Sequence, residues 1–142
     1  MNVSAKTAYA ALALLELAVH YKSGEPVRIR AIAEAHGIPA RFLVQILLQL
    51  KGAGLVSSTR GAAGGYQLVR APAEITLGDV REIIEGQAAL PEVDPGAATV
   101  SARVLREAWR AVARAERDAQ SAITLADLVE RVRGRTEAMY YI

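Results

Sequence analysis

The chain has 142 residues, of which 52% are hydrophobic and 23% are charged, and this balance predicts a folded globular protein. It contains no cysteine, which excludes disulfide bonds, thiolate metal sites and cysteine nucleophiles. No apolar run is long enough to cross a bilayer, and the N-terminus lacks the layout of a signal peptide. We therefore expect a cytoplasmic protein that does not enter membranes.

The net charge of +2 is unevenly distributed along the chain. Residues 1–70 contain eight basic and three acidic residues and carry +5, whereas residues 71–142 contain nine basic and twelve acidic residues and carry −3. Many ordinary domains divide their charge in this way. If the asymmetry is functional, it indicates that only the first half meets a polyanion.

The first two helices are predicted from composition and from helix-end signals. Ser4–Tyr21 is rich in alanine and leucine, with Ser4 as its N-cap, and is apolar on nearly every face. This pattern predicts a central, buried helix. Val27–His36 forms a second, shorter helix that stops at Gly37. The two histidines of the chain are expected to be isolated surface residues at helix ends and not metal ligands: His20 and His36.

A third helix is predicted within Ile38–Leu55, starting at Pro39 and ending at Gly52 and Gly54. Its inner, apolar stripe consists of Leu43, Ile46, Leu47 and Leu50. Its outer face carries four residues that are three or four apart and are therefore neighbours on the surface: Arg41, Val44, Gln45 and Leu48. An ordinary solvated helix face is the alternative, although the apolar valine and leucine weigh against it.

Two short β-prone segments, Leu55–Ser58 and Tyr66–Val69, flank a run of glycine and alanine. The run alone is consistent with a flexible hairpin loop. Two helices joined by a glycine turn and followed by a hairpin, however, form the outline of a winged helix-turn-helix. In that arrangement the hairpin is the wing, and Tyr66 anchors its returning strand on the core.

The residue types on the third helix and the wing suit DNA. Arg41 and Gln45 carry donors that read guanine and adenine edges in the major groove, and Val44 and Leu48 suit a thymine methyl or a partner protein. Arg60 suits a phosphate or a narrow minor groove. Small residues let the wing tip approach the sugar–phosphate backbone, and three of them complete this set of candidate contacts: Gly61, Gly64 and Gly65.

The second half of the chain contains a long helix, predicted over Ala97–Ile123. Its small and apolar residues recur mostly every four positions and form a seam along which two copies can approach closely: Val100, Val104, Ala108, Val112, Ala115 and Ala119. Leu105 and Trp109 widen this stripe. The alternative is a helix that packs only within its own subunit. The other face is expected to be solvated, with Arg106, Arg110, Arg114, Arg117, Glu107, Glu116 and Asp118.

The segments ITLGDVREIIEG (Ile75–Gly86) and ITLADLVERVRG (Ile123–Gly134) share the pattern ITL-x-D. In each, a threonine can cap a helix and an aspartate lies near the positive helix end. We interpret the similarity as the same capping chemistry used twice and not as a duplication.

An enzyme is not expected. No serine–histidine–acid set, paired carboxylates or phosphate-cradling loop can be assembled from the sequence, and the GAAGG run lies in a hairpin and not between a strand and a helix.

The chain resembles the Rrf2 family of bacterial winged helix-turn-helix transcription regulators. The resemblance is carried by IAEAHGIPARFLVQIL, KGAGLVSSTRGAAGGYQL, ITLGDVREIIEG and AITLADLVERV, and by the start from Lys6 to Tyr9. It implies that Arg41, Phe42 and Gln45 contact DNA from the recognition helix, as do Arg60 and Gly61 from the wing. Lys6 and Tyr9 are implied to lie near the DNA backbone. Arg28, a further basic residue of the first half, is also a candidate DNA contact.

The chain departs from the family in three places. Iron–sulfur members carry three cysteines in the loop after the ITLGDV helix, whereas the matching stretch 88–104 has none, so a cluster held by thiolates is excluded. Val44 stands where glutamate is common, and Ala8 where arginine is usual. We expect no metal or cofactor, and regulation by a metabolite or a partner protein.

Together these features predict a mainly α fold with a small β-hairpin wing and a long C-terminal dimerisation helix. The expected division is a DNA-binding domain over 1–85, a loop over 86–99, and a dimerisation and C-terminal helical part over 100–142. The expected function is a homodimeric, sequence-specific repressor that binds a palindromic operator. The alternative is a winged-helix protein-interaction module, or a regulator controlled by a partner or metabolite, with weak or no DNA binding.

Overall fold

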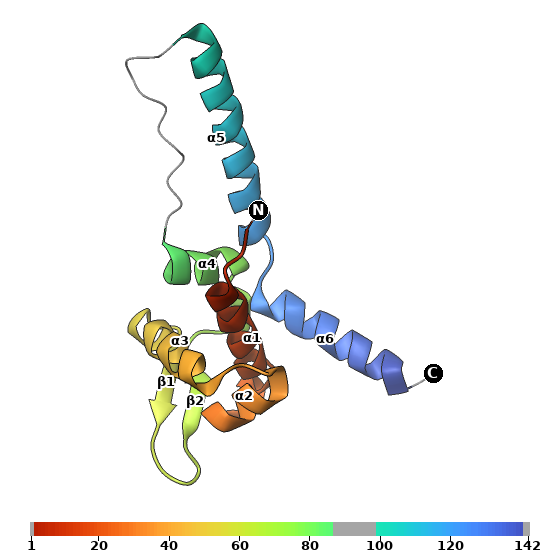
Figure 1. Cartoon of the computed structure of the whole chain (residues 1–142). Helices are drawn as coiled ribbons and strands as arrows, with labels where there is room; N and C mark the ends of the chain where they lie inside the picture. Colours follow the sequence, from red (N-terminus) through yellow and green to blue (C-terminus); the bar gives the residue numbers. More distant parts are fainter. Residues whose placement is uncertain (1, 87–98, 141–142) are drawn as a thin grey trace.

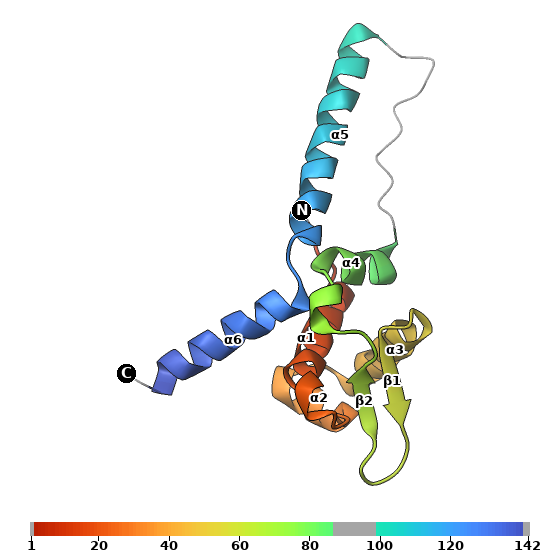
Figure 2. The same ribbon diagram turned by 180° about the vertical axis from the view of Figure 1, so that it is seen from behind.

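The computed structural model describes residues 2–86 and 99–140, and these are mostly helical (Figure 1). In chain order the elements are α1 (Ala5–Val19), η1 (Tyr21–Ser23), α2 (Ile29–His36), α3 (Ala40–Gly52), β1 (Val56–Thr59), β2 (Gly65–Leu68), η2 (Pro72–Glu74), α4 (Leu77–Glu85), α5 (Val100–Ser121) and α6 (Leu125–Tyr140). The hairpin lies at one end of the molecule and α5 projects from the other, as both views show (Figures 1 and 2). The predicted fold class is confirmed.

Helix α1 is the centre of the core, as its composition predicts. The Ser4 side chain caps the helix by accepting a hydrogen bond of 3.1 Å from the Thr7 backbone N–H. Ala10, Ala13 and Leu14 are fully buried, and the two alanines allow neighbouring helices to approach closely. α1 consequently packs against α3, α4 and α6.

The turn between α2 and α3 depends on Gly37, which adopts the left-handed conformation with φ 62°. After the turn, Ile38 is buried and its backbone N–H donates to the Ala33 carbonyl at 3.1 Å. The inner stripe predicted for α3 is confirmed, since all four residues are fully buried: Leu43, Ile46, Leu47 and Leu50. This burial fixes which face of α3 remains outside.

The two strands pair antiparallel, with Val56 opposite Leu68 and Thr59 opposite Gly65. Val56 and Leu68 are buried and attach the hairpin to the core. Val27, two residues before α2, also pairs with β2, because its N–H and C=O exchange two hydrogen bonds of 2.8 Å with Tyr66. This third pairing was not foreseen from the sequence, and it links the start of the helix-turn-helix directly to the wing.

The two ITL-x-D segments both cap helices. Thr76 accepts from the Asp79 N–H at 3.1 Å while Asp79 accepts from the Thr76 N–H at 2.9 Å, so both halves of the capping box are present. Thr124 and Asp127 repeat the arrangement with the same distances. The hydrogen bonds from the Thr124 backbone and side chain hold the pKa of the Asp127 carboxyl below its ordinary value.

The same two segments also contact each other. Leu77 N–H donates to the Ile123 carbonyl at 3.0 Å, and Leu125 N–H donates to the Ile75 carbonyl at 2.9 Å. This small antiparallel bridge between Thr76 and Thr124 joins the starts of α4 and α6. Capping explains the similarity of the segments, and the bridge shows that they are also structural partners.

Helix α6 begins inside the core, where Leu125 and Val129 are buried. The expected division placed it with α5 in residues 100–142, whereas its first turns belong to the same hydrophobic core as the winged unit. Of the expected loop 86–99, residues 87–98 lie outside the described ranges. Among the helices of the described chain, none has both the length and the apolar character that a bilayer crossing requires.

Candidate nucleic-acid interface

The outer face of α3 is exposed along its whole length. Arg41 and Gln45 are both exposed. Three large apolar side chains on the same helix are also unusually open to solvent, with Phe42 51% exposed, Val44 41% and Leu48 56%. Arg41, Val44, Gln45 and Leu48 were predicted to form the outer face, and this exposure is confirmed. Phe42, which only the family resemblance implied as a DNA contact, is exposed beside them.

Two side-chain hydrogen bonds hold α3 against its neighbours. Gln49 Nε2 donates to the Ile83 carbonyl of α4 at 2.8 Å, and Lys51 Nζ donates to Ser58 Oγ of β1 at 2.7 Å. The position of the exposed face is therefore fixed relative to both α4 and the wing. Sequence reasoning missed Lys51, although a basic residue at the end of this helix was visible in the sequence.

The start of α1 joins the exposed face of α3. The rings of Tyr9 and Phe42 lie with their centroids 6.4 Å apart at an interplanar angle of 40°, within the range of favourable aromatic pairs. Lys6 is half-buried and lies three residues before Tyr9 on α1, so the two are neighbours on the helix surface. The structure thus brings the N-terminal patch and the recognition helix together.

The wing carries one arginine near its tip, and a second arginine from the start of the helix-turn-helix lies against the same end of the wing. Arg60 follows β1 and is exposed, and Gly64 N–H donates to the Gly61 carbonyl at 3.0 Å to close the tip. An open groove of about 330 Å³ runs along the inner side of the wing, between Arg28 and the backbone of Gly61. Arg28 and Arg60 are both exposed and place two cationic groups toward the same end of the wing, where their charge suits phosphates.

The expectation that Gly64 and Gly65 are small to make room for DNA needs correction. Gly64 is buried, and a Cβ there would collide with the Thr59 carbonyl oxygen. A Cβ on Gly65 would lie 2.5 Å from the Val27 carbonyl carbon, and its φ of +150° suits glycine. Both glycines are required by packing within the wing and against Val27. Gly61, by contrast, has open space around it.

The prediction that the two histidines are isolated was wrong. His36 Nε2 donates to Glu16 Oε2 at 2.9 Å, and His20 Nε2 donates to Glu16 Oε1 at 3.3 Å. Glu16 therefore ties the end of α2, next to the helix-turn-helix turn, to α1. Nothing in the local sequence indicates this contact, since Glu16 and His36 are 20 residues apart.

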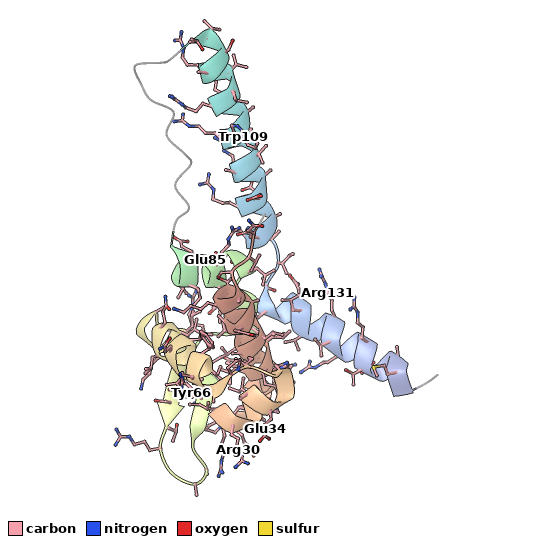
Figure 3. The ribbon with its side chains drawn as sticks, viewed as in Figure 1. Arg30, Glu34, Tyr66, Glu85, Trp109 and Arg131 are labelled. Atoms are coloured by element: carbon pink, nitrogen blue, oxygen red, sulfur yellow. The ribbon has the colours of Figure 1, made fainter. Side chains whose placement is uncertain are left out.

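Helices α2 and α3 form a helix-turn-helix in which α3 buries one face and exposes the other, and the hairpin wing follows it; this arrangement defines a winged-helix DNA-binding protein. Tyr66, marked in Figure 3, lies where the wing meets the helical body. The profile of the Rrf2 family, described as an iron-dependent transcriptional regulator, matches residues 3–131. The chain belongs to the Rrf2 family and is a DNA-binding transcription regulator.

Individual relatives agree with this assignment. The transcriptional regulator CymR of Bacillus subtilis (strain 168) is 34% identical over 143 residues, and the alignment spans the full length of both chains. The solved structure of CymR, described as the global cysteine regulator of that species, has a TM-score of 0.81 at 31% identity, covering 92% of this chain and 98% of that one. The structure of T. potens IscR has a TM-score of 0.76 at 33% identity, covering 93% and 88%. These relatives are regulators and not enzymes.

The iron named in the family description does not fit the donor atoms of this chain. The sequence has no cysteine, so no thiolate ligand exists. Within residues 2–86 and 99–140, no group of three or more histidine, aspartate or glutamate side chains is placed to hold a metal ion. The residues present give no support for a family-type iron site.

Gly65→Ala should lower the free energy of unfolding by about 1–3 kcal/mol, because alanine is strained at this φ and its methyl collides with the Val27 backbone. Gly52→Ala is the matched control, since Gly52 ends α3 with open space around it. Urea unfolding curves of both variants would test this. Equal stability of the two variants would contradict the packing role of Gly65.

Proposed function

We propose that the chain is a homodimeric, sequence-specific repressor that acts in the cytoplasm and binds a palindromic operator. The observation that carries the DNA-binding part is the joint exposure of α3 and the wing, with Arg41 and Gln45 on one and Arg60 on the other. Base edges are read by such α3 side chains in the major groove, while the wing arginine neutralises phosphate.

The homodimer is supported by α5. No residue of this 22-residue helix is buried, and its apolar side chains are between 50% and 69% exposed: Val100, Val104, Leu105, Trp109 and Val112. Ala108, Ala115 and Ala119 are also exposed and complete the stripe. Figure 3 shows Trp109 in the middle of α5, away from the helical body. An apolar stripe of this length favours burial against a second copy of the same helix.

We further propose that the chain carries no iron–sulfur cluster and responds to a metabolite or a partner protein. The absence of cysteine supports the first part. A cavity of about 240 Å³ between α4 and α5, lined by Arg81, Glu116 and Arg117 among others, supports the second. A signal acting there would change how α5 meets the winged unit, and hence the separation of two recognition helices in a dimer.

The alternative function is a winged-helix protein-interaction module. One observation supports it: the apolar side chains of Phe42, Val44 and Leu48 are exposed and could contact a partner protein. Fluorescence anisotropy with a nonspecific duplex at low salt separates the two functions. A DNA-binding protein responds and loses affinity steeply as salt rises, whereas an interaction module shows no response.

Two substitutions should affect DNA binding differently. Arg60→Ala should weaken binding to all sequences by a similar factor and reduce the salt slope by about 1, because its contact is with phosphate. Gln45→Ala should cost about 1–3 kcal/mol at a single base pair of the operator. Binding to a library of operator variants measures both effects, with exposed Arg135→Ala on α6 as the control. Indistinguishable specificity profiles would refute this division of roles.

Ala115→Glu should block close approach along α5 and give monomers or unfolded chain, because it places a charge within the small-residue stripe. Sedimentation velocity at micromolar concentration would detect the change. Ala73→Glu, at an exposed position of η2, is the control and should leave the dimer intact. A wild-type chain that sediments as a monomer would rule out the seam.

Protein purified without oxygen should be colourless and free of iron, and should bind its operator equally well with and without nitric oxide. The reason is that no thiolate is present to hold a cluster or to react. Metal analysis and a binding assay test this together. Stoichiometric iron, or loss of binding on exposure to nitric oxide, would overturn the proposal.

A further inference from the structure

Gln49 lies in the last turn of α3 and connects the recognition helix to α4. It comes four residues after Gln45, so the two glutamines are neighbours on the same side of the helix. Gln45 is exposed, whereas Gln49 is half-buried and its Nε2 donates to the Ile83 carbonyl at 2.8 Å. One glutamine is therefore available to a ligand, and the other is already bound within the protein.

The acceptor of this bond belongs to the end of a neighbouring helix. Ile83 lies in the last turn of α4, where backbone carbonyls lack partners within their own helix, and Gln49 supplies such a partner. α4 lies on the side of α3 away from the wing tip (Figures 1 and 2). It is itself held in place, because Arg81 donates to Glu85 Oε2 at 3.1 Å and to the Asn2 carbonyl at 3.2 Å. Gln49 thus attaches α3 to a supported point.

The rotation of α3 about its own axis is what this bond can set. The buried apolar stripe already selects the inner face of α3, but apolar burial is not directional. A helix with its side chains has a radius of about 5–6 Å, so a rotation of about 10° moves a side-chain tip by about 1 Å. The distance range of an N–H···O hydrogen bond is only about 0.5 Å wide. Reading base edges therefore requires finer control of α3 than apolar burial provides.

We propose that Gln49 is a positioning residue for operator recognition, which sets the rotation of α3 and makes no base contact itself. Arg41 and Gln45 lie about 12 Å and about 6 Å from it along the helix axis, so both depend on the same anchor. Loss of the anchor affects every base pair that these two residues read, and not one base pair alone. The proposal rests on the proposed DNA contacts of α3, and not on the dimer or an effector.

A direct base contact by Gln49 does not fit the structure. To read adenine, a glutamine uses its amide oxygen and nitrogen together. The nitrogen of Gln49 is bound to the Ile83 carbonyl of its own chain. A purely structural bond is the other explanation, and it predicts a change in stability without a change in specificity.

The test uses the full-length protein and a duplex that the wild type selects from a random-sequence library. Gln49→Met keeps the length of the side chain but removes the donor. This variant should bind the selected duplex roughly tenfold more weakly, because several base contacts are displaced together. Its affinity for a nonspecific duplex and its salt slope should be unchanged, since these depend on phosphate contacts. Single-substitution duplexes should show weaker discrimination at all base pairs read by α3.

Two further variants complete the design. Gln49→Lys retains a donor, and its charge suits carbonyls at a helix C-terminus, so it should keep the wild-type ratio of selected to nonspecific affinity. Gln67→Met on β2 is the matched control. Gln67 is half-buried, and its side chain makes no hydrogen bond to the described residues. This control should leave both affinities and the specificity profile unchanged.

Urea unfolding of each variant separates positioning from stability. A folded Gln49→Met protein with wild-type specificity would overturn the proposal, whatever its stability. Loss of discrimination at a single base pair would also overturn it, because that result indicates a direct base contact. Gln49→Glu, which has the size of glutamine and no donor when ionised, takes the same test if the methionine variant does not fold. A wild type that selects no duplex would instead refute DNA recognition by α3 altogether, and the proposal with it.

Discussion

The burial of α1 among α3, α4 and α6 is the interaction on which the remaining structure depends. The small alanine side chains of α1 let three helices pack closely against it. Each buried leucine contributes about 1.5–3 kcal/mol to the free energy of folding. Because the inner face of α3 is committed to this core, its outer face can expose Phe42, Val44 and Leu48 without loss of the fold. The packing of the core thus determines which face of α3 is available to bind DNA.

Local contacts then set the position of each functional part. Val27 pairs with Tyr66 and aligns the wing with α2, while Lys51 and Gln49 hold α3 to the wing and to α4. The bridge between Thr76 and Thr124 connects the starts of α4 and α6, and α5 lies between these two helices in the sequence. A change at α5 can therefore be transmitted to the winged unit through short, hydrogen-bonded contacts.

The fold was largely predictable because strong local signals specify it. Helix caps at Ser4 and Thr76, the left-handed turn at Gly37 and the apolar stripe of α3 are all visible as short patterns. Contacts between distant residues were not predictable. The Glu16–His36 bond joins residues 20 apart, and the need for glycine at position 65 arises from the Val27 backbone, which only the folded chain brings near.

Hydroxyl-radical footprinting on a duplex selected by the protein tests the central claim most directly, namely that two identical winged units bind one operator. We predict two equivalent sets of protected positions related by a two-fold axis. Their centres should be separated by one helical turn of about 34–36 Å, or a multiple of it. A single asymmetric set of protections, or none, would contradict this account.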